Sequence, residues 1–383
     1  MNHSLIKVLV ALSLSWVICS CSESNSYSSG NKVFVKQSPV ALTYAKGFTI
    51  DTIPGGLQSI VIQDLNSQTQ IAKYILVPKG SKYQPSADES IIHTPIDDIG
   101  VLSSSYIGFL DALNLTQNIS IIENHEFIYH SGVLNQYKNG NTIEVGSNGQ
   151  INLEKLVINA PQIIFTSAYN GGLSEDLLKA QDAGISIVQC SEWQENHPLA
   201  RAEWIKLFGV LTDQKILADS LFQDIETNYK SISEKCKSAS FQPKVLFSSM
   251  YQDIWYIPGG KSYIAKILQD VNATYAWSAD DNTGSLQLSF ESVATKAIQN
   301  DVWINPEVNS IEELLSRDPR YQSFVDNIKQ GIFQQNAKTT PQGGNDYWES
   351  GVVRADWVLQ DYAKIMHPQL FENTNFTYFN QIK

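Results

Sequence analysis

Two consecutive helical patterns in the middle of the chain, residues 197–237, most constrain how it can fold. The first, HPLARAEWIKLFGVL, carries its proline where an opening helical turn tolerates one. The second follows Thr212, a residue type that caps helices, and repeats apolar residues three and four positions apart, as at Leu221 and Ile225. A helix of about 25 residues is roughly 38 Å long, comparable with a whole domain. Because strand-like and helix-like patterns alternate on both sides, we expect this helix to join two α/β lobes.

The N-terminus has the pattern of a targeting segment rather than of a folded element. Lys7 is its one charged residue, and the apolar run 8–18 is as long as a signal peptide but too short to span a bilayer. The run ends in ICSC, which resembles a bacterial lipobox, with Cys21 directly after a small residue. We therefore expect residues 1–21 to be a lipoprotein signal, Cys21 to be lipidated and residues 22–31 to be a flexible tether. The alternative is a plain secretory signal.

Composition narrows the class of partner. A chain of 383 residues is long enough for two domains with cores of their own. The net charge of −12 argues against nucleic acid or an anionic membrane surface as a partner. A disulfide between Cys190 and Cys236 is permitted outside the cytoplasm, but we expect buried free thiols.

The order of patterns predicts the division of the chain. Short runs rich in β-branched residues, separated by turn signals, predict a β meander from residue 32, followed by a polar connector over 80–95. Strands and helices then alternate as in a parallel sheet covered on both faces. We expect an N-terminal lobe over 96–211, the joining helix over 212–238 and a C-terminal lobe over 239–383. The predicted strands are 99–102, 119–122, 163–166, 185–188, 244–248 and 302–304, and the later helices include 321–330 and 352–366.

Few motifs point to catalysis. Residues 259–262, GGKS, lack the first glycine of a phosphate-binding loop, because Trp255 stands in its place. The six histidines show no metal-ligand spacing, so we expect no protein-bound metal. Residues 103–105, three serines after a predicted strand, suit hydrogen bonding to a ligand as well as a nucleophile. Two alternatives stay open here: a hydrolase-like enzyme using these serines, and a surface haem or carbohydrate binder in which His125 could be an axial ligand.

Loop aromatics and two glutamates stand out. Aromatic residues gather where predicted strands end, the usual ligand-binding edge of an α/β sheet. A faint repeat places Glu154 and Glu291 each in the first turn of a helix that leads into a strand. These glutamates are either ordinary helix-end charges or a matched pair with a shared role.

Four motifs together resemble one known family. They are YAKGF (44–48), YILVP (74–78), HPLARAEW (197–204) and GGNDYWE (343–349). They resemble substrate-binding lipoproteins of iron-complex and vitamin B12 ABC importers, in the form common among Bacteroidetes, over residues 32–380. The resemblance implies an α/β fold of two Rossmann-like lobes joined by a single long helix, with an N-terminal β decoration. It also implies a periplasmic, non-enzymatic monomer that captures a small metal chelate and delivers it to an ABC permease and its ATPase.

The resemblance also implies site residues. Glu154 and Glu291 match the glutamates that dock such proteins onto basic residues of the permease. Lys261 could contact an anionic ligand. The cleft positions are Ser104, Ser105, Tyr106, Tyr169, Asn170, Trp255, Tyr256, Asn345, Asp346, Tyr347 and Trp348.

The nature of the ligand is less constrained. Ferric siderophores are usually held by arginines, and the chain has four, Arg201, Arg317, Arg320 and Arg354. The pattern leaves Arg354 as the one near the cleft loop. Aromatic walls with few cations favour cobalamin slightly over a ferric siderophore, with no further cofactor.

Overall fold

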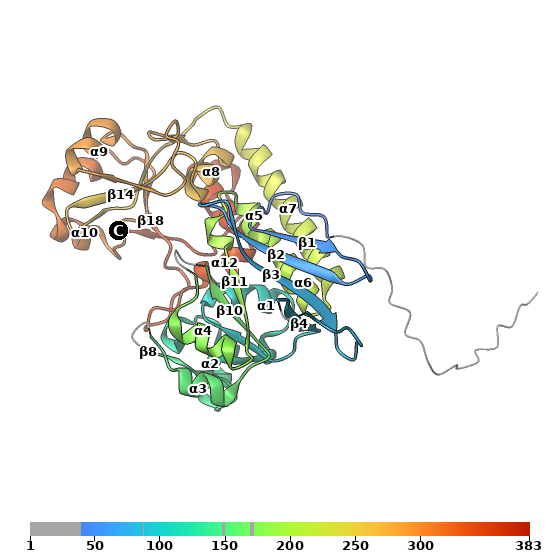
Figure 1. Cartoon of the computed structure of the whole chain (residues 1–383). Coiled ribbons are helices and arrows are strands. Elements are labelled where there is room, and N and C mark those ends of the chain that lie inside the picture. Colours follow the sequence, from blue (N-terminus) through green and yellow to red (C-terminus); the bar gives the residue numbers. More distant parts are fainter. Residues whose placement is uncertain (1–39, 87, 148–149, 169–171) are drawn as a thin grey trace, which may run out of the picture. The chain divides into compact units, whose positions relative to one another are not determined.

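The N-terminal lobe is built on a parallel sheet with the strand order β11-β10-β5-β6-β7 (Figure 1). The structure is a computed structural model that describes residues 40–86, 88–147, 150–168 and 172–383. The strands are β5 (Ile99–Val101), β6 (Ile119–Ile122), β7 (Ile143–Glu144), β10 (Ile163–Ser167) and β11 (Ser186–Cys190). The helices are α1 (Ser104–Ala112), α2 (Ser131–Lys138), α3 (Leu153–Asn159) and α4 (Glu175–Asp182), with 3-10 turns η1 (Thr116–Asn118), η2 (His125–Phe127) and η3 (Glu192–Gln194) and a small hairpin of β8 (Gly146–Ser147) and β9 (Gln150–Ile151).

The C-terminal lobe repeats this plan. Its sheet has the order β15-β12-β17-β18-β19, parallel except for the last strand. The strands are β12 (Lys244–Phe247), β15 (Thr274–Tyr275), β17 (Val302–Ile304), β18 (Gly331–Gln334) and β19 (Asn380–Ile382), beside an antiparallel sheet of β13 (Met250–Tyr251), β14 (Ile254–Pro258) and β16 (Ser285–Leu288). The helices are α8 (Tyr263–Asp270), α9 (Phe290–Ala297), α10 (Ile311–Arg317) and α11 (Gln322–Val325), with η4 (Pro319–Tyr321), η5 (Asp346–Trp348) and η6 (Pro368–Leu370). The predicted fold class of two α/β lobes is thus confirmed.

The long helix α7 (Lys215–Lys237) lies where the sequence predicts it and packs on α6 and α13. Thr212, however, does not cap it. Its hydroxyl donates to the carbonyl of Phe208, 2.7 Å away, and so closes the preceding helix. That preceding helix is also two helices, α5 (Pro198–Glu203) and α6 (Ile205–Leu211), which meet at Trp204.

Two helical expectations near the C-terminus are wrong in extent. The predicted helix 321–330 ends at Val325, and β18 follows it. The predicted helix 352–366 is broken at Arg354 into α12 (Ser350–Val353) and α13 (Ala355–Met366). Residues 335–349 lead from the C-terminal sheet to α12, which packs on α1 of the N-terminal lobe. The lobes are therefore linked by this returning segment as well as by α7.

The N-terminal sheet has four strands, β1 (Phe48–Thr52), β2 (Gln58–Asp64), β3 (Thr69–Pro78) and β4 (Ser90–Thr94). The first three form the predicted antiparallel meander. The fourth pairs in parallel with β3, inside the segment expected to be a connector. The Tyr74 hydroxyl donates to the carbonyl of Ile187, 2.7 Å away, and so joins this sheet to strand β11. Cys21 lies outside the described residues.

Two buried glutamates hold the start of this sheet. Glu203 accepts hydrogen bonds of 2.7–3.1 Å from the backbone N–H groups of Thr43, Tyr44 and Ala45 and pairs with Lys206 at 2.8 Å. Its side chain is fully buried. Charge-assisted bonds to backbone donors are among the stronger hydrogen bonds in proteins. The YAKGF and HPLARAEW motifs are therefore two halves of one interaction.

Glu195 holds the next residues in the same way. Its Oε1 accepts from the N–H groups of Lys46 at 2.7 Å and Gly47 at 2.8 Å, and from the indole N–H of Trp204 at 3.3 Å. A Cβ at position 47 would lie 2.6 Å from the hydroxyl of Ser191 and 2.7 Å from the Trp204 ring. Glycine is therefore required for this close approach.

We expect Glu203→Ala to lower the free energy of unfolding by about 3 kcal/mol, because it leaves several backbone donors buried without an acceptor and removes the carboxylate partner of Lys206, which keeps its bond to the carbonyl of Ala41 at 2.9 Å. Urea denaturation measures the loss. The matched control is Glu234→Ala, which removes an exposed ion pair with Lys237 on α7 and should leave the midpoint unchanged. A Glu203→Ala variant as stable as this control would contradict the interpretation.

Candidate functional site

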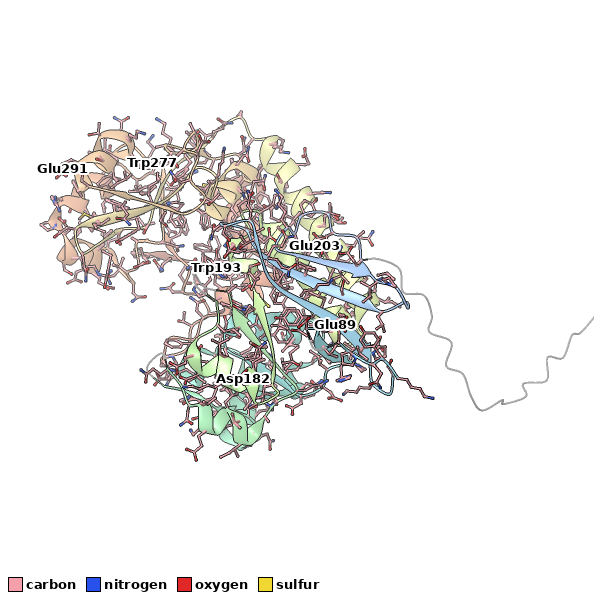
Figure 2. All side chains as sticks on the ribbon, in the orientation of Figure 1. Glu89, Asp182, Trp193, Glu203, Trp277 and Glu291 are labelled. Carbon is pink, nitrogen blue, oxygen red and sulfur yellow. The ribbon has the colours of Figure 1, made fainter. Side chains whose placement is uncertain are left out.

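A cavity of about 640 Å³ lies between the two lobes and is the best candidate for a ligand site. One wall comes from the turn after β11 and from α5, with Trp193, Gln194, Glu195, Asn196 and Arg201, and from Asn66 of the N-terminal sheet. The facing wall comes from the C-terminal lobe, chiefly Phe247, Ser248, Tyr256, Tyr263, Ser285 and Glu307, and Tyr347 and Trp348 complete it. Figure 2 shows Trp193 where the lobes meet.

Six of the nineteen residues that line the cavity are aromatic. Trp193, Tyr256 and Trp348 keep 38 %, 36 % and 48 % of their surface exposed, which is unusual for residues that normally avoid water. The Tyr347 and Trp348 rings meet edge to face with centroids 4.8 Å apart. Exposed rings around a hollow of this size suit a bulky ligand with an apolar body.

Arg201 is the one lysine or arginine among the described residues that line the cavity. Its Nε donates to the carbonyl of Glu195 at 3.2 Å and its Nη2 to that of Trp193 at 2.6 Å. The guanidinium also lies over the ring of Tyr263, 4.0 Å from the centroid. No carboxylate pairs with it in the described part of the chain, so its charge is available to an anionic group.

Three carboxylates lie on or near this wall, those of Glu195, Glu192 and Glu307. Glu195 Oε1 accepts from two backbone N–H groups, and burial raises the pKa of Glu195. Burial likewise raises the pKa of Glu192 to about 7. Glu307 is exposed and, like Ser248, has a left-handed backbone, with φ of 61° and 63°. Strained backbone of this kind collects at binding sites, where the rest of the fold maintains it.

The turn that carries Tyr347 and Trp348 is tied to the N-terminal lobe by Glu349. This residue is 2 % exposed and accepts hydrogen bonds from the backbone N–H groups of Tyr129 at 2.5 Å and His130 at 2.9 Å. A Cβ on Gly344 would lie 2.2 Å from the carbonyl of Ile128. The GGNDYWE motif thus forms a close contact between segments about 220 residues apart.

Of the predicted cleft residues, the structure brings Tyr256, Tyr347 and Trp348 together in the cavity. Tyr169 and Asn170 lie outside the described residues. Asn345 and Asp346 do not line the cavity but support the turn that carries Tyr347 and Trp348. Asn345 donates to the carbonyl of Gln335 at 2.9 Å and caps the N–H of Tyr347 at 3.0 Å, and Asp346 pairs with Lys338 at 3.0 Å.

The other predicted cleft residues lie elsewhere. Trp255 has no exposed surface and packs among aromatic rings in the C-terminal core, so its expected place in the cleft is wrong. Tyr106 is equally buried, with its hydroxyl 3.0 Å from that of Ser167. Ser104 borders a separate hollow of about 30 Å³, and the N–H of Ser105 donates to the Ser103 cap of α1. Lys261 is exposed and pairs with Asp281 at 2.6 Å.

The structure adds lining residues that the sequence analysis missed. Arg201, Trp193, Asn66 and Asn196 face the cavity, yet none belonged to the expected set. Arg354 was expected near the cleft but pairs with Asp356 at 2.6 Å and lines a second cavity. HPLARAEW was the available signal for Arg201, because it is one of the family-like motifs and contains that arginine.

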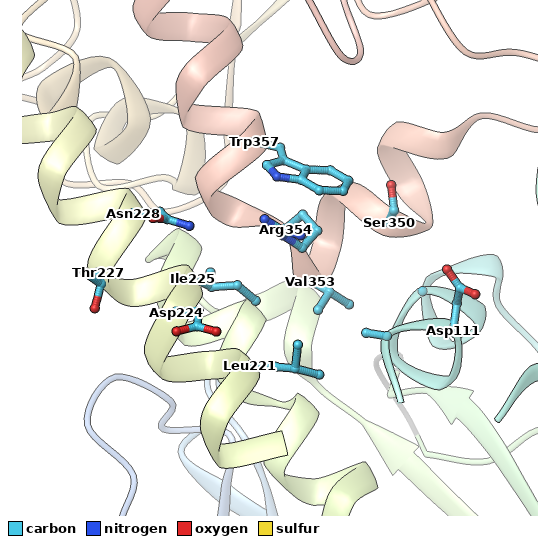
Figure 3. Close-up of a pocket in the computed structure, with 12 residues that line it drawn as sticks. Asp111, Leu221, Asp224, Ile225, Thr227, Asn228, Ser350, Val353, Arg354 and Trp357 are labelled. Atoms are coloured by element: carbon cyan, nitrogen blue, oxygen red, sulfur yellow. The ribbon is translucent and has the colours of Figure 1, made fainter. Parts of the chain in front are cut away.

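The second cavity, of about 500 Å³, opens between α7, α1 and the α12–α13 turn (Figure 3). Leu221 and Ile225 of α7 and Val353 form its apolar surface, and Arg354 stacks on Trp357 with 3.6 Å to the ring centroid. It shares no lining residue with the interlobe cavity. Its one described arginine is neutralised by Asp356, so it offers less for recognition of an anion.

Comparison with known proteins identifies the family. A family model described as "Periplasmic binding protein" matches residues 99–324, more than half of the chain. The chain belongs to this family of periplasmic binding proteins. Residues 40–98, which include the N-terminal sheet, precede the matched region.

The chain is also similar to curated relatives and shares its fold with solved structures. Two uncharacterized lipoproteins of Methanocaldococcus jannaschii are 29 % and 25 % identical, over 79 % and 81 % of this chain and 73 % and 80 % of their own length. A possible iron-binding (periplasmic solute-binding) protein from Staphylococcus epidermidis has a TM-score of 0.56 at 20 % identity, covering 71 % of this chain and 99 % of that one. A periplasmic binding protein from Veillonella parvula shares the fold with a TM-score of 0.57 at 13 % identity, covering 84 % of this chain and 98 % of that one. A periplasmic heme-binding protein of Vibrio cholerae does so with a TM-score of 0.52 at 16 % identity, covering 68 % of this chain and 98 % of that one.

The organism of these relatives bears on the expected Bacteroidetes type. The M. jannaschii proteins are archaeal lipoproteins, so a Bacteroidetes type stays a prediction. Among the described residues, none of the helices has the length and apolarity needed to cross a bilayer. Cys190 and Cys236 are buried free thiols, as predicted.

The two predicted docking glutamates of this periplasmic binding protein are both exposed in the first turn of a helix. Glu154 belongs to α3, where Asn152 caps the N–H of Lys155 at 2.9 Å. Glu291 belongs to α9 and is 76 % exposed, with Arg320 3.5 Å away. Figure 2 shows Glu291 at the outer edge of its lobe. The geometry leaves both carboxylates accessible to a partner.

Among the described residues, the hydrolase alternative lacks the base it needs, and the haem alternative loses His125 as its axial ligand. A serine nucleophile needs a histidine base, but no described histidine hydrogen bonds to residues 103–105. His125 pairs with Glu144, stacks on Tyr137 and does not line the cavity. No three described His, Cys, Asp or Glu side chains gather into a possible metal site.

Glu349 makes stability depend on pH. Burial raises its pKa to about 7 from an ordinary 4.5, so between these values the folded state holds more of the proton than the unfolded state does. The contribution is complete below about pH 4.5 and is lost as the pH rises through 7. We expect the free energy of unfolding to fall by roughly 2 kcal/mol through this residue between pH 5 and pH 8.

Urea titrations of wild type and Glu349→Gln at both pH values measure this. The isosteric variant should lose that part of the pH dependence, while Glu192 and Asp361, whose pKa values burial also raises, keep theirs. Equal falls in both proteins would show that Glu349 does not titrate in this window.

Proposed function

We propose that this periplasmic binding protein captures a metal chelate, a ferric siderophore or cobalamin, in the interlobe cavity and delivers it to an ABC permease and its ATPase. The observation that carries the proposal is Arg201, an arginine without a carboxylate partner, set among exposed aromatic rings in a cavity of about 640 Å³. Chelates of this kind combine a bulky, partly apolar body with anionic groups. The arrangement is complementary to both features.

Several further points support this assignment. The fold is shared with proteins described as iron-binding or heme-binding, so haem is a third chelate to test. The cavity matches a binding role better than an enzymatic one, since no base stands beside a candidate nucleophile in the described residues. We infer a monomeric protein without a resident cofactor and without nucleic-acid partners, held at the membrane by a lipid on Cys21 and acting in the periplasm.

Delivery would depend on Glu154 and Glu291. Each is presented by the first turn of a helix on a different lobe and is exposed, and Glu291 also has Arg320 beside it at 3.5 Å. Two separated ion contacts fix orientation and speed encounter more than they add affinity. We infer that the permease recognises the distance between these two carboxylates.

Replacing Arg201 by alanine should weaken ligand binding at least tenfold, because a charge-assisted hydrogen bond in a partly dry cavity is lost. Titrations with cyanocobalamin, ferrioxamine B and haemin, followed by tryptophan fluorescence, measure the affinity, and the loss is expected for the two probes with anionic groups, cyanocobalamin with its phosphate and haemin with its propionates. Arg317→Ala is the matched control, since Arg317 pairs with Glu313 on the surface and does not line the cavity. Failure of wild type to bind any of the three probes below millimolar concentration would overturn the ligand class.

The double variant Glu154→Lys, Glu291→Lys should bind its ligand as wild type does but no longer stimulate the ATPase of the reconstituted transporter. The reason is that lysines repel the basic residues expected on the permease. Ligand titration and ATPase assays on the same preparation separate the two effects. A loss of ligand affinity would instead assign these glutamates to the structure of the helix ends, and full ATPase stimulation would remove them from docking.

A further inference from the structure

The turn between β2 and β3 reaches the ligand cavity, although it lies outside the region that the family model matches. Asn66 of this turn lines the cavity. The turn is held by Asp64, whose Oδ1 accepts from the N–H groups of Asn66 at 2.9 Å and Ser67 at 2.8 Å. These bonds lower the pKa of Asp64 and keep it a charged acceptor. The position of Asn66 is therefore set by the local sequence.

The side-chain amide of Gln194 joins the same turn to the segment that follows β11. Gln194 accepts from the N–H of Leu65 at 2.6 Å and donates to Asp64 Oδ2 at 3.1 Å. Ser191 donates to the carbonyl of Gln63 at 2.8 Å. Residues 191–196 include much of the cavity wall, so these bonds make the turn part of that wall.

Two further side-chain amides on this wall make no hydrogen bonds among the described residues. Asn66 and Asn196 are both exposed, both line the cavity, and neither side-chain amide has a hydrogen-bond partner among the described residues. Gln194, in contrast, has both its amide groups engaged. A free carboxamide offers both donors and an acceptor, so it matches groups that also donate and accept, such as amides and hydroxyls.

We propose that Asn66 and Asn196 form a subsite for uncharged hydrogen-bonding groups of the bound ligand, amides or hydroxyls, and that the N-terminal sheet thereby contributes to specificity. This rests on the proposed function of the cavity. The ligand then has two distinct faces. An anionic group meets Arg201, and neutral amide or hydroxyl groups at its periphery meet the two asparagines.

The test is the double variant Asn66→Leu, Asn196→Leu, titrated with cyanocobalamin, ferrioxamine B and haemin. The first two probes carry amides at their periphery, and haemin carries carboxylates instead. Each lost hydrogen bond should weaken binding about threefold to tenfold, so the double variant should bind an amide-bearing probe at least tenfold more weakly. Gln70→Leu is the matched control, because it changes an exposed amide on β3 that does not line the cavity.

The outcomes separate the subsite from the proposed function. Binding of any probe by wild type supports the cavity as a ligand site, and the ratio between variant and wild type tests the subsite alone. The subsite is overturned if the double variant stays within twofold of wild type for every amide-bearing probe that wild type binds, or if wild type binds haemin alone. If wild type binds none of the probes, the proposed function fails and the subsite fails with it. Thermal melts confirm that the exposed substitutions leave the fold intact.

Discussion

Buried carboxylates that accept hydrogen bonds from distant backbone are the interactions on which this structure depends. Glu203 and Glu195 together bind the N–H groups of residues 43–47, about 150 positions earlier in the chain. Each burial costs desolvation, and the bonds from several donors offset part of that cost. Because Glu195 shortly precedes α5 and Glu203 is its last residue, the N-terminal sheet is attached at the place where the lobes meet, not at a remote edge. That attachment is what lets the β2–β3 turn reach the cavity.

Buried carboxylates also accept hydrogen bonds from distant backbone near the C-terminal end of the chain. Glu349 accepts from the backbone of Tyr129 and His130, and Asp361 accepts from the N–H groups of Thr377 and Tyr378 at 2.6–3.0 Å. Burial raises the pKa of Glu349 to about 7 and that of Asp361 to about 6. In these two cases desolvation outweighs the hydrogen bonds that favour the charged form. These contacts join remote segments without a disulfide, which agrees with the two described cysteines being free thiols.

What the sequence could predict follows from which signals are local. Apolar strands and the stripe of α7 are periodic, and they were placed to within a few residues. The helix breaks at Trp204 and Arg354 have no local signal, because tertiary packing decides them. Trp255 and Tyr256 are adjacent on β14, so they point to opposite faces, and one is buried while the other lines the cavity. Arg201 was missed because helical periodicity does not show which neighbour a side chain meets.

These hydrogen bonds also divide the cavity wall into two parts, one attached to the N-terminal lobe and one belonging to the C-terminal lobe. Residues 191–196 are fixed by the N-terminal sheet, and the turn with Tyr347 and Trp348 is fixed to the N-terminal lobe through Glu349. The wall from β14 and α8 belongs to the other lobe and meets the first part at the stack of Arg201 on Tyr263. The stiff helix α7, the returning segment that leads to α12 and this stack together allow small lobe movements rather than wide opening. Since Arg201 both lines the cavity and stacks on Tyr263, an anionic ligand that bound it would lie at this contact between the lobes.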